Sequence, residues 1–246
     1  MPNNNNNNDF KYNKHKPHLP NLDELRNIKY WIFDIDDTLY PKSTGLNKQI
    51  QDSMINYISN YFKIPWSEAS QLCISYYKKY GTTITGLMNT TDINPRRFVN
   101  ETHRYLDLSC IQANPLLAKA LSEIKAKKYV FTNGSFGHGL RVSKKLGIEQ
   151  HINGFFGTQS ANFIPKPDPR AFEEFFNRYN IDPKEAIFFD DSKANHETIS
   201  KMGTKTVWVT EDDQLNEELP EYVDYQTSDI TSWLDYFANT KLKEIA

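Results

Sequence analysis

Four short polar stretches could carry chemistry, and each ends or follows a predicted strand. They are DIDDT at 34–38, TNGS at 132–135, KPDP at 166–169 and DDS at 190–192. Bulky apolar runs, such as WIF at 31–33, precede several of them and are typical of buried strands. Because an unpaired buried charge is costly, acids that directly follow a buried strand require an explanation.

The acids form two pairs. Asp34 and Asp36 are two residues apart, so on an extended backbone their carboxylates would face the same way. Carboxylates at one point repel each other unless a cation neutralises them. A hard divalent ion such as Mg²⁺ prefers oxygen ligands and keeps waters for a substrate phosphate. Asp190 and Asp191 repeat the arrangement, so the sequence predicts a cation site; an acidic turn is the alternative.

The other two stretches could hold an anion. Thr132 precedes a predicted helix, where a hydroxyl and free backbone N–H groups suit an oxyanion, although a plain turn is the alternative. Lys166 lies between two prolines; the alternative is an ordinary exposed lysine. We interpret Asp168 as a helix N-cap. Together, the acids could hold a cation, the lysine and hydroxyl could hold an oxyanion, and one carboxylate could attack phosphorus.

The elements that must position these groups alternate between strand and helix. Strands are predicted at 30–33, 129–131, 155–156, 187–189 and 207–209, and helices at 137–145, 168–179 and 193–202. This alternation predicts an α/β fold, with a Rossmann-like parallel sheet and helices on both faces. In such sheets ligands bind beyond the carboxyl ends of the strands, where the four stretches would converge.

The long gap between the first two strands predicts an inserted unit. It contains helical patterns at 46–63, 66–80 and 95–106 but no convincing strand, so we interpret it as an all-helical cap. The predicted organisation is a disordered Asn-rich tail at 1–27, a core domain at 28–42 and 114–246, and a helical cap at 43–113.

Composition excludes several classes of function. The formal net charge is -2 and no basic face stands out, so nucleic acid is not an expected partner. The first residues lack the apolar segment of a secretory signal, and no run is long enough to span a membrane. The two cysteines, Cys73 and Cys110, have no metal-ligand spacing and favour a reducing compartment. We therefore expect a soluble, cytoplasmic protein without a membrane partner.

The four stretches, in this order, resemble the motifs of the haloacid dehalogenase (HAD) superfamily of phosphohydrolases over roughly residues 28–210. The resemblance implies Mg²⁺ as cofactor, a cap of the C1 type, and a carboxylate nucleophile at Asp34 that also binds the metal. It implies that Asp36 is the general acid/base, with its backbone carbonyl on the metal. An acid at this second position argues against a true dehalogenase.

The same resemblance assigns the remaining core motifs. Thr132 and Lys166 match the groups that orient the phosphate, and we expect Asn133 to bind substrate beside them. Asp191 matches the metal-binding acid, with Asp190 assisting. We interpret His138 and His196 as helix-surface histidines outside the site.

A narrower likeness concerns substrate choice. DIDDTLYP, YYKKYGTTITGLM at 76–88 and TNGSFGHGLRVSKKLGI look like the pyrimidine 5′-nucleotidase branch. This resemblance implies a nucleoside 5′-monophosphate substrate, with Tyr80 and Thr83 of the cap as specificity residues. The alternatives are a phosphatase of another small phosphometabolite, such as a sugar phosphate or phosphoglycolate, and a catalytically idle domain that binds a partner. The protein is expected to be a monomer or a homodimer.

Overall fold

A computed structural model describes residues 20–215 and 218–243 of the chain. Within these residues, six parallel strands form one sheet in the order β3-β2-β1-β4-β5-β6. They are β1 (Tyr30–Phe33), β2 (Lys127–Phe131), β3 (Gly154–Phe156), β4 (Ala186–Asp190), β5 (Lys205–Val209) and β6 (Tyr225–Thr227). Strand β1, which leads into DIDDT, lies between β2 and β4, so three of the four polar stretches follow adjacent strands.

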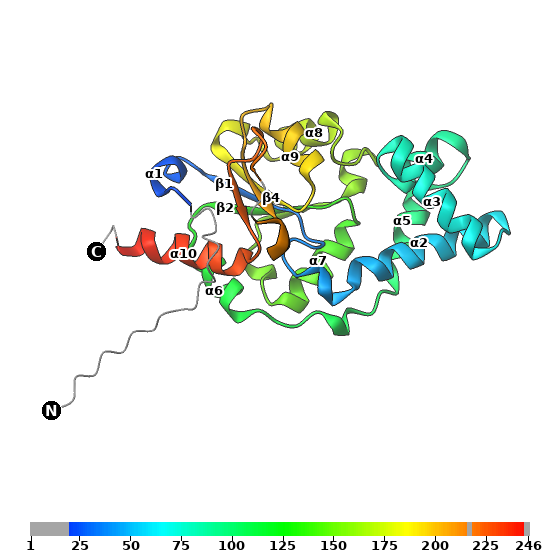
Figure 1. Ribbon diagram of the computed structural model, residues 1–246, viewed down its shortest axis with the longest axis horizontal. Helices are drawn as coiled ribbons and strands as arrows, with labels where there is room; N and C mark the ends of the chain where they lie inside the picture. The colour runs from blue at the N-terminus through cyan, green and yellow to red at the C-terminus, as the bar shows by residue number, and fades with distance from the viewer. Residues whose placement is uncertain (1–19, 216–217, 244–246) are drawn as a thin grey trace.

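The central strands are buried on both faces. Trp31 and Phe33 of β1 belong to one apolar cluster and Ile32 to another on the opposite face. Helices cover both faces, so the strands can be almost entirely apolar. In Figure 1, α6, α7 and α10 lie on one side of the sheet and α8 and α9 on the other. Their bounds are α6 (Pro115–Glu123), α7 (Phe136–Leu146), α8 (Pro169–Tyr179), α9 (Lys193–Ser200) and α10 (Ile230–Lys243).

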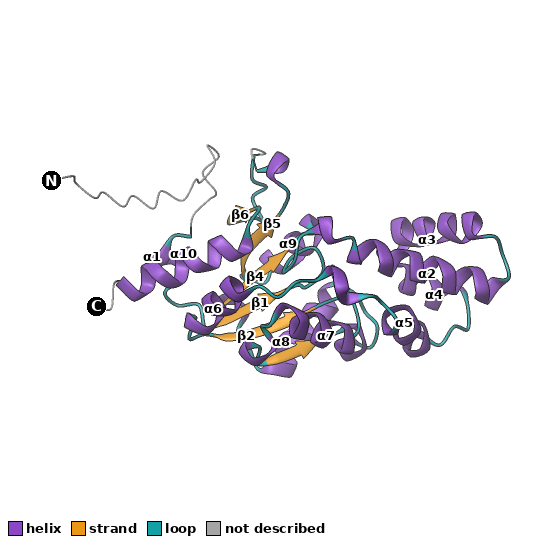
Figure 2. Ribbon diagram, turned by 90° about the horizontal axis from the view of Figure 1, so that it is seen from below, coloured by secondary structure: helices purple, strands orange, loops and turns teal. Residues whose placement is uncertain are grey.

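A group of helices between β1 and α6 forms a separate lobe with its own apolar core. It contains α2 (Leu46–Phe62), α3 (Trp66–Tyr80), α4 (Thr83–Thr90) and α5 (Pro95–Arg104), and we call residues 46–104 the helical insertion. Ile58, Leu87 and Phe98 are at the centre of its core. Figures 1 and 2 both show the helical insertion beyond one end of the sheet.

Apolar packing and hydrogen bonds join the helical insertion to the sheet-bearing part of the chain. Phe163, in the loop after β3, packs against the apolar core of the helical insertion. Arg141 of α7 donates hydrogen bonds to the backbone carbonyls of Arg104, at 2.9 Å, and of His103. These are carbonyls at the C-terminal end of α5, which lack partners within the helix. A cation at that end also interacts favourably with the helix dipole.

The α/β fold class and all the predicted strands are confirmed. The predicted helix end at Gly147 is also confirmed, because this residue has a φ of 76° and its N–H donates to the carbonyls of Ser143 and Lys144. Strand β6 and the helices α1 (Leu22–Leu25), α4, α6 and α10 were not predicted. The sequence of β6, YQT, is too short and polar to stand out as an apolar run.

The predicted disordered tail was too long. Residues 22–25 form a short helix, α1 (Leu22–Leu25), and Leu25 is completely buried in the core. Residues 1–19 of the predicted tail lie outside the described part of the chain. Among the helices of the described residues, none is long and apolar enough to cross a membrane.

Candidate active site

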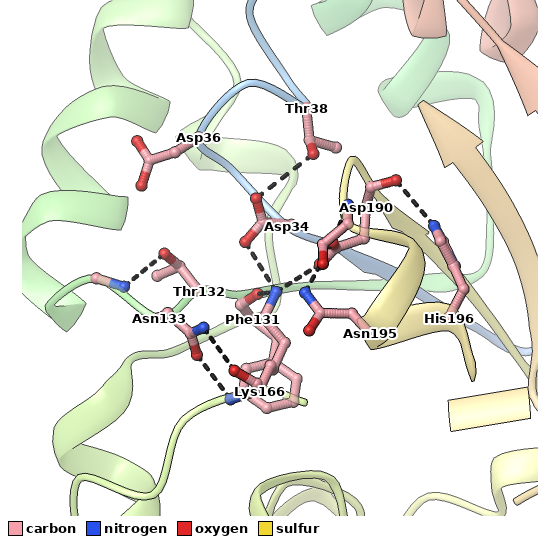
Figure 3. Close-up of polar contacts among 12 residues, drawn as sticks. Asp34, Asp36, Thr38, Phe131, Thr132, Asn133, Lys166, Asp190, Asn195 and His196 are labelled. Carbon is pink, nitrogen blue, oxygen red and sulfur yellow. Dashed lines mark hydrogen bonds and ion pairs between the residues drawn. The ribbon is translucent and has the colours of Figure 1, made fainter. Parts of the chain in front are cut away.

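The four polar stretches meet at the carboxyl ends of the central strands. Asp34 directly follows β1, Thr132 follows β2, and Asp190 ends β4. Because these strands are parallel neighbours, their ends lie at one edge of the sheet. Lys166, from the loop before α8, reaches into the same place, as Figure 3 shows.

Lys166 is the centre of a buried ionic cluster. Its ammonium donates to Asp34 Oδ1 at 2.8 Å, to Asp190 Oδ2 at 2.6 Å and to the carbonyl of Phe131 at 2.9 Å. The residue is only 2% exposed, so it is not an ordinary surface lysine. Burial alone would lower the pKa of Lys166, but the two carboxylates raise it above its usual range. Lys166 therefore keeps a full positive charge beside Asp34.

Asn133 holds the Lys166 loop in place. The amide of its side chain donates to the Lys166 carbonyl at 2.9 Å, and its Oδ1 accepts from the Lys166 N–H at 2.8 Å. We predicted a substrate-binding role for Asn133 and did not foresee this structural one. The hydroxyl of Thr132 accepts a hydrogen bond from the Gly134 N–H at 2.9 Å, which closes a tight turn between β2 and α7. The carbonyl of the preceding residue, Phe131, accepts from the Lys166 ammonium, so Thr132 adjoins the cluster along the chain.

Asp34 lies in a strongly charged and desolvated position. Its side chain is buried, and one oxygen is 3.4 Å from the Thr38 hydroxyl, which donates to it. Burial raises the pKa of Asp34 well above its usual range; Lys166 opposes this, while Asp190 and Asp191 add to it. A carboxylate attacks only in its ionised form, so positive charge close to Asp34 is a requirement of any nucleophilic role.

The backbone turns at Asp36, so the expectation that Asp34 and Asp36 face the same way is wrong. Strand β1 ends at Phe33, and Asp36 already lies in the following turn. Figure 3 shows its carboxylate directed away from the Lys166 cluster. Oδ1 of Asp36 instead accepts a hydrogen bond from the Tyr40 hydroxyl at 2.6 Å and lies 2.7 Å from His138 Nε2.

His138 is therefore not a surface histidine. It lies on the inner face of α7 and is completely buried. Burial would raise the pKa of Asp36, but His138 and the Tyr40 hydrogen bond outweigh it, and the net pKa is lowered. His196 is likewise buried, and its Nε2 lies 2.9 Å from the carbonyl of Asp190. The interpretation of His138 and His196 as helix-surface residues was therefore wrong. The glycine-rich or polar sequences of their helices do not reveal which face turns inward.

Asp190 supports the lysine rather than standing free. One of its oxygens accepts from Lys166, and the other accepts from the Ser192 N–H and the Asn195 amide, both at 2.8 Å. Both oxygens of this fully buried carboxylate are thus in use. Asn195 was not singled out by the sequence, although it follows the paired acids by only a few residues.

Asp191 has surroundings that favour a nearby cation. Its side chain reaches solvent, but surrounding protein desolvates it, and this together with Asp190 and Asp37 raises its pKa to about 7. One oxygen of Asp37 is buried and has no hydrogen-bond partner in the described part of the chain. The acids therefore outnumber the one lysine, and their hard oxygen atoms fit a divalent cation.

Few side chains in the described part of the chain could bind a metal ion together. Among the described residues, no three His, Cys, Asp or Glu side chains converge closely enough to hold a metal ion by themselves. This fits an ion such as Mg²⁺, which is often held by one or two carboxylates and otherwise by water and substrate oxygens. It does not fit a closed structural metal site, which would need a full set of protein ligands.

The two predicted specificity residues lie in the helical insertion. Tyr80 ends α3, where its ring packs near Tyr76, and Thr83 begins α4 and is buried. Among the described contacts, no hydrogen bond or ion pair joins either residue to the four motifs. His103 of α5 comes closer: its ring centroid is 5.1 Å from that of His138. Sequence reasoning missed His103 because no motif contains it.

A parallel sheet with an acid after its central strand and a buried lysine beside it defines a class of α/β hydrolase. The model of the haloacid dehalogenase-like hydrolase family matches residues 28–203, and the chain belongs to this family. The match extends across β1 to α9, and so contains all four polar stretches.

The chain is similar in sequence or in fold to several known proteins, which have different names. The chain is 30% identical over 220 residues to "Phosphate metabolism protein 8" of Saccharomyces cerevisiae, covering 82% of this chain and 67% of that protein. It is 24% identical over 225 residues to "Glyceraldehyde 3-phosphate phosphatase" of Pyrococcus furiosus, covering 86% and 93%. The crystal structure of a HAD phosphatase from Thermococcus onnurineus has a TM-score of 0.54 and 18% identity, covering 89% and 97%. The last similarity shows the fold alone.

Proposed function

We propose that the protein is a phosphoric monoester hydrolase that acts through an aspartyl-phosphate on Asp34. The observation that carries this proposal is the buried cluster in which Lys166 lies 2.8 Å from Asp34 at the end of the central strand. Membership of a hydrolase family and a relative named as a phosphatase support it. A catalytically idle binding domain is disfavoured, because buried acids cost stability and such a domain gains nothing by keeping them.

In the first step, Oδ2 of Asp34, the oxygen that Lys166 does not bind, attacks phosphorus and displaces the alcohol of the ester. Lys166 keeps Asp34 ionised and stabilises the charge that develops on the phosphoryl oxygens. In this proposal, the Thr132 hydroxyl, which follows β2 at the same edge of the sheet, orients these oxygens. In the second step, water attacks the phosphoryl group, releases inorganic phosphate and restores Asp34.

Asp36 transfers protons in both steps. The protonated carboxyl of Asp36 gives its proton to the departing alkoxide, and the resulting carboxylate takes a proton from the attacking water, which restores the protonated form. The lowered pKa of Asp36 favours the second of these roles. Its carboxylate is directed away from the Asp34 cluster, and Tyr40 and His138 engage only one of its two oxygens among the described contacts. Asp36 thus needs a neighbourhood different from that of Asp34, and the structure around the two acids differs accordingly.

The acids fit a Mg²⁺ ion, which would be held by the side chains of Asp34 and Asp191 and by the backbone carbonyl of Asp36. When bound, such an ion supplies Lewis-acid stabilisation of phosphoryl charge and screens Asp34 from its acidic neighbours. Asp190, which we had grouped with the metal ligands, acts by holding Lys166.

The substrate is a small phosphorylated metabolite, and we propose that the helical insertion acts as the cap that selects it. A nucleoside 5′-monophosphate, with a pyrimidine base, is the candidate that the segment 76–88 supports. A relative named for glyceraldehyde 3-phosphate supports the alternative of a sugar or triose phosphate. A panel of both kinds of ester separates the two.

The proposal is tested by measuring phosphate release from nucleotides, sugar phosphates, phosphoglycolate and an aryl phosphate. Each is assayed with Mg²⁺, after EDTA, and after Mg²⁺ is restored. We expect release that EDTA stops and Mg²⁺ restores. Rapid acid quenching should also trap a phosphorylated protein, with the label on Asp34. A folded protein that releases phosphate from no ester would refute the proposal, and activity in a metal-free sample would refute the cation site.

A further inference from the structure

The two oxygens of Asp36 have different surroundings. Oδ1 accepts the Tyr40 hydroxyl at 2.6 Å and lies 2.7 Å from His138 Nε2. Within the described part of the chain, Oδ2 has no hydrogen-bond partner. Tyr40 and His138 are both buried, so these hydrogen bonds are shielded from competing water. One oxygen is therefore fixed by two neighbours and the other is left free.

The surroundings of His138 determine which of its ring nitrogens carries the proton. Nδ1 is buried and has no hydrogen-bond partner among the described residues. If only Nδ1 carried hydrogen, that donor would be unsatisfied, and Nε2 would direct a lone pair at a carboxylate oxygen 2.7 Å away. Nε2 therefore donates to Asp36, and His138 acts on the same oxygen as Tyr40.

Several contacts hold His138 in this orientation. The backbone N–H of His138 donates to the hydroxyl of Ser135, the N-cap residue of α7, at 3.0 Å. Its ring packs against His103, which the helical insertion supplies. The absence of a side chain at Gly134 provides the space for both rings. A Cβ at this position would lie 3.2 Å from the His138 ring and 3.4 Å from His103 Nε2. His138 is thus fixed from its own helix and from the helical insertion.

We propose that His138 and Tyr40 are positioning residues that bind Oδ1 of Asp36, so that Oδ2 is the oxygen that carries the proton to the leaving group and takes it from water. This inference rests on the proposed phosphatase function. Neither residue touches the phosphoryl group, and both act through Asp36. Proton transfer requires a carboxyl oxygen held at a fixed distance from the reacting atom, and a freely rotating carboxylate would offer that geometry only part of the time.

The experiment compares the first chemical step with two kinds of ester by rapid mixing. An alkyl phosphate leaves as a basic alkoxide and needs the proton from Asp36, whereas an activated aryl phosphate leaves as a stable phenolate and needs it much less. We expect His138→Ala to slow phosphorylation by the alkyl ester by about 10–100-fold, within the range of general acid catalysis, and by the aryl ester by only about 3-fold or less. With the aryl ester, an initial burst of phenolate should then be followed by slow turnover.

Three variants make the comparison specific. His138→Gln should recover part of the lost rate, because a glutamine amide can donate from nearly the same place. Tyr40→Phe keeps the ring and should show the same ester dependence as His138→Ala. This variant keeps the inference testable if His138→Ala does not fold. Tyr129→Phe is the matched control, since it alters a buried tyrosine of the sheet far from Asp36 in the sequence and should leave both rates unchanged.

The decisive test uses an Asp36→Asn background. A residue that acts through Asp36 should cause no further loss there, so adding His138→Ala should leave the already low rates unchanged. Equal losses with both esters in Tyr40→Phe and His138→Gln, or a full further loss in the Asp36→Asn background, would overturn the inference. Absence of turnover by the wild-type protein with every ester would instead refute the proposed function itself.

Discussion

The sheet edge and the helical insertion are stabilised by different kinds of contact. At the sheet edge, several charged groups are buried and held by short hydrogen bonds, as Lys166 is by Asp34 and Asp190. The helical insertion has a small apolar core and leaves several large side chains exposed, among them Trp66, Ile74 and Tyr77. Charge in a dry site fixes geometry strongly, whereas a small apolar core tolerates substitution. The contrast suggests that the sheet edge carries the chemistry and the helical insertion carries the choice of substrate.

The contrast predicts that the largest effect comes from the nucleophile. Asp34→Asn replaces the carboxylate by an amide of nearly the same size, so the protein should fold while kcat falls on the order of 10⁴-fold or more. The matched control is Asp168→Asn. That acid caps α8 and pairs with Arg170, and its loss should leave kcat within about 3-fold of wild type. Substantial turnover by a folded Asp34→Asn protein would contradict the assignment.

Lys166→Met should lower both activity and stability. The variant loses the charge that stabilises the phosphoryl oxygens, which predicts a fall in kcat of about 10²–10³-fold. It also leaves Asp34 and Asp190 buried without their counter-charge, and breaking such a pair typically costs about 3–5 kcal/mol of unfolding free energy. Urea unfolding with and without Mg²⁺ measures the second effect.

Lys128→Met separates these effects from the loss of any buried lysine. Lys128 is also buried in β2, but its ammonium donates to the carbonyls of Ile124 and Ala126, the latter at 2.9 Å, and to no carboxylate. It should lose stability without a specific loss of kcat. If Lys128→Met and Lys166→Met lower kcat in the same proportion to their loss of unfolding free energy, the catalytic role of Lys166 is wrong.

A smaller effect is expected in the helical insertion. Tyr80→Phe and Thr83→Val should change the ratio of kcat/KM between a nucleotide and a triose phosphate by about 10-fold, the scale of one or two pocket contacts. The rate with a small aryl phosphate should stay close to wild type. Tyr77→Phe is the control on the same helix, because Tyr77 is two-thirds exposed. An unchanged ranking of substrates would place recognition elsewhere.

The sequence predicted the sheet edge better than the parts that surround it. The strands and the sites of Asp34, Thr132 and Asp190 follow from local patterns, because apolar runs fix strands and parallel strands fix a common edge. His138 and His103 could not be found in this way. Their role depends on two helices that are far apart in the chain and meet only after folding. Strand β6 was missed because its pairing with β5, rather than its own composition, makes it a strand.

The smallest predicted effect concerns His103, where the two regions meet. Burial, with an added contribution from His138, lowers the pKa of His103 to about 4, against about 6.5 for an exposed histidine. Between these values the unfolded chain binds more protons than the folded protein, so the free energy of unfolding falls as the pH is lowered from about 7 towards 4. The contribution of this one group at pH 5 is about 2 kcal/mol.

His103→Gln isolates that contribution, because glutamine does not titrate. The variant should be less stable than wild type at pH 7.5, since it loses the ring contact with His138. Its free energy of unfolding should nevertheless fall by about 1–2 kcal/mol less than that of wild type between pH 7.5 and pH 5. His151→Gln, at a partly exposed position, should change this difference much less. Urea unfolding at several pH values measures all three proteins. If wild type and His103→Gln lose the same stability on acidification, His103 is not held neutral at the contact between the helical insertion and the sheet edge.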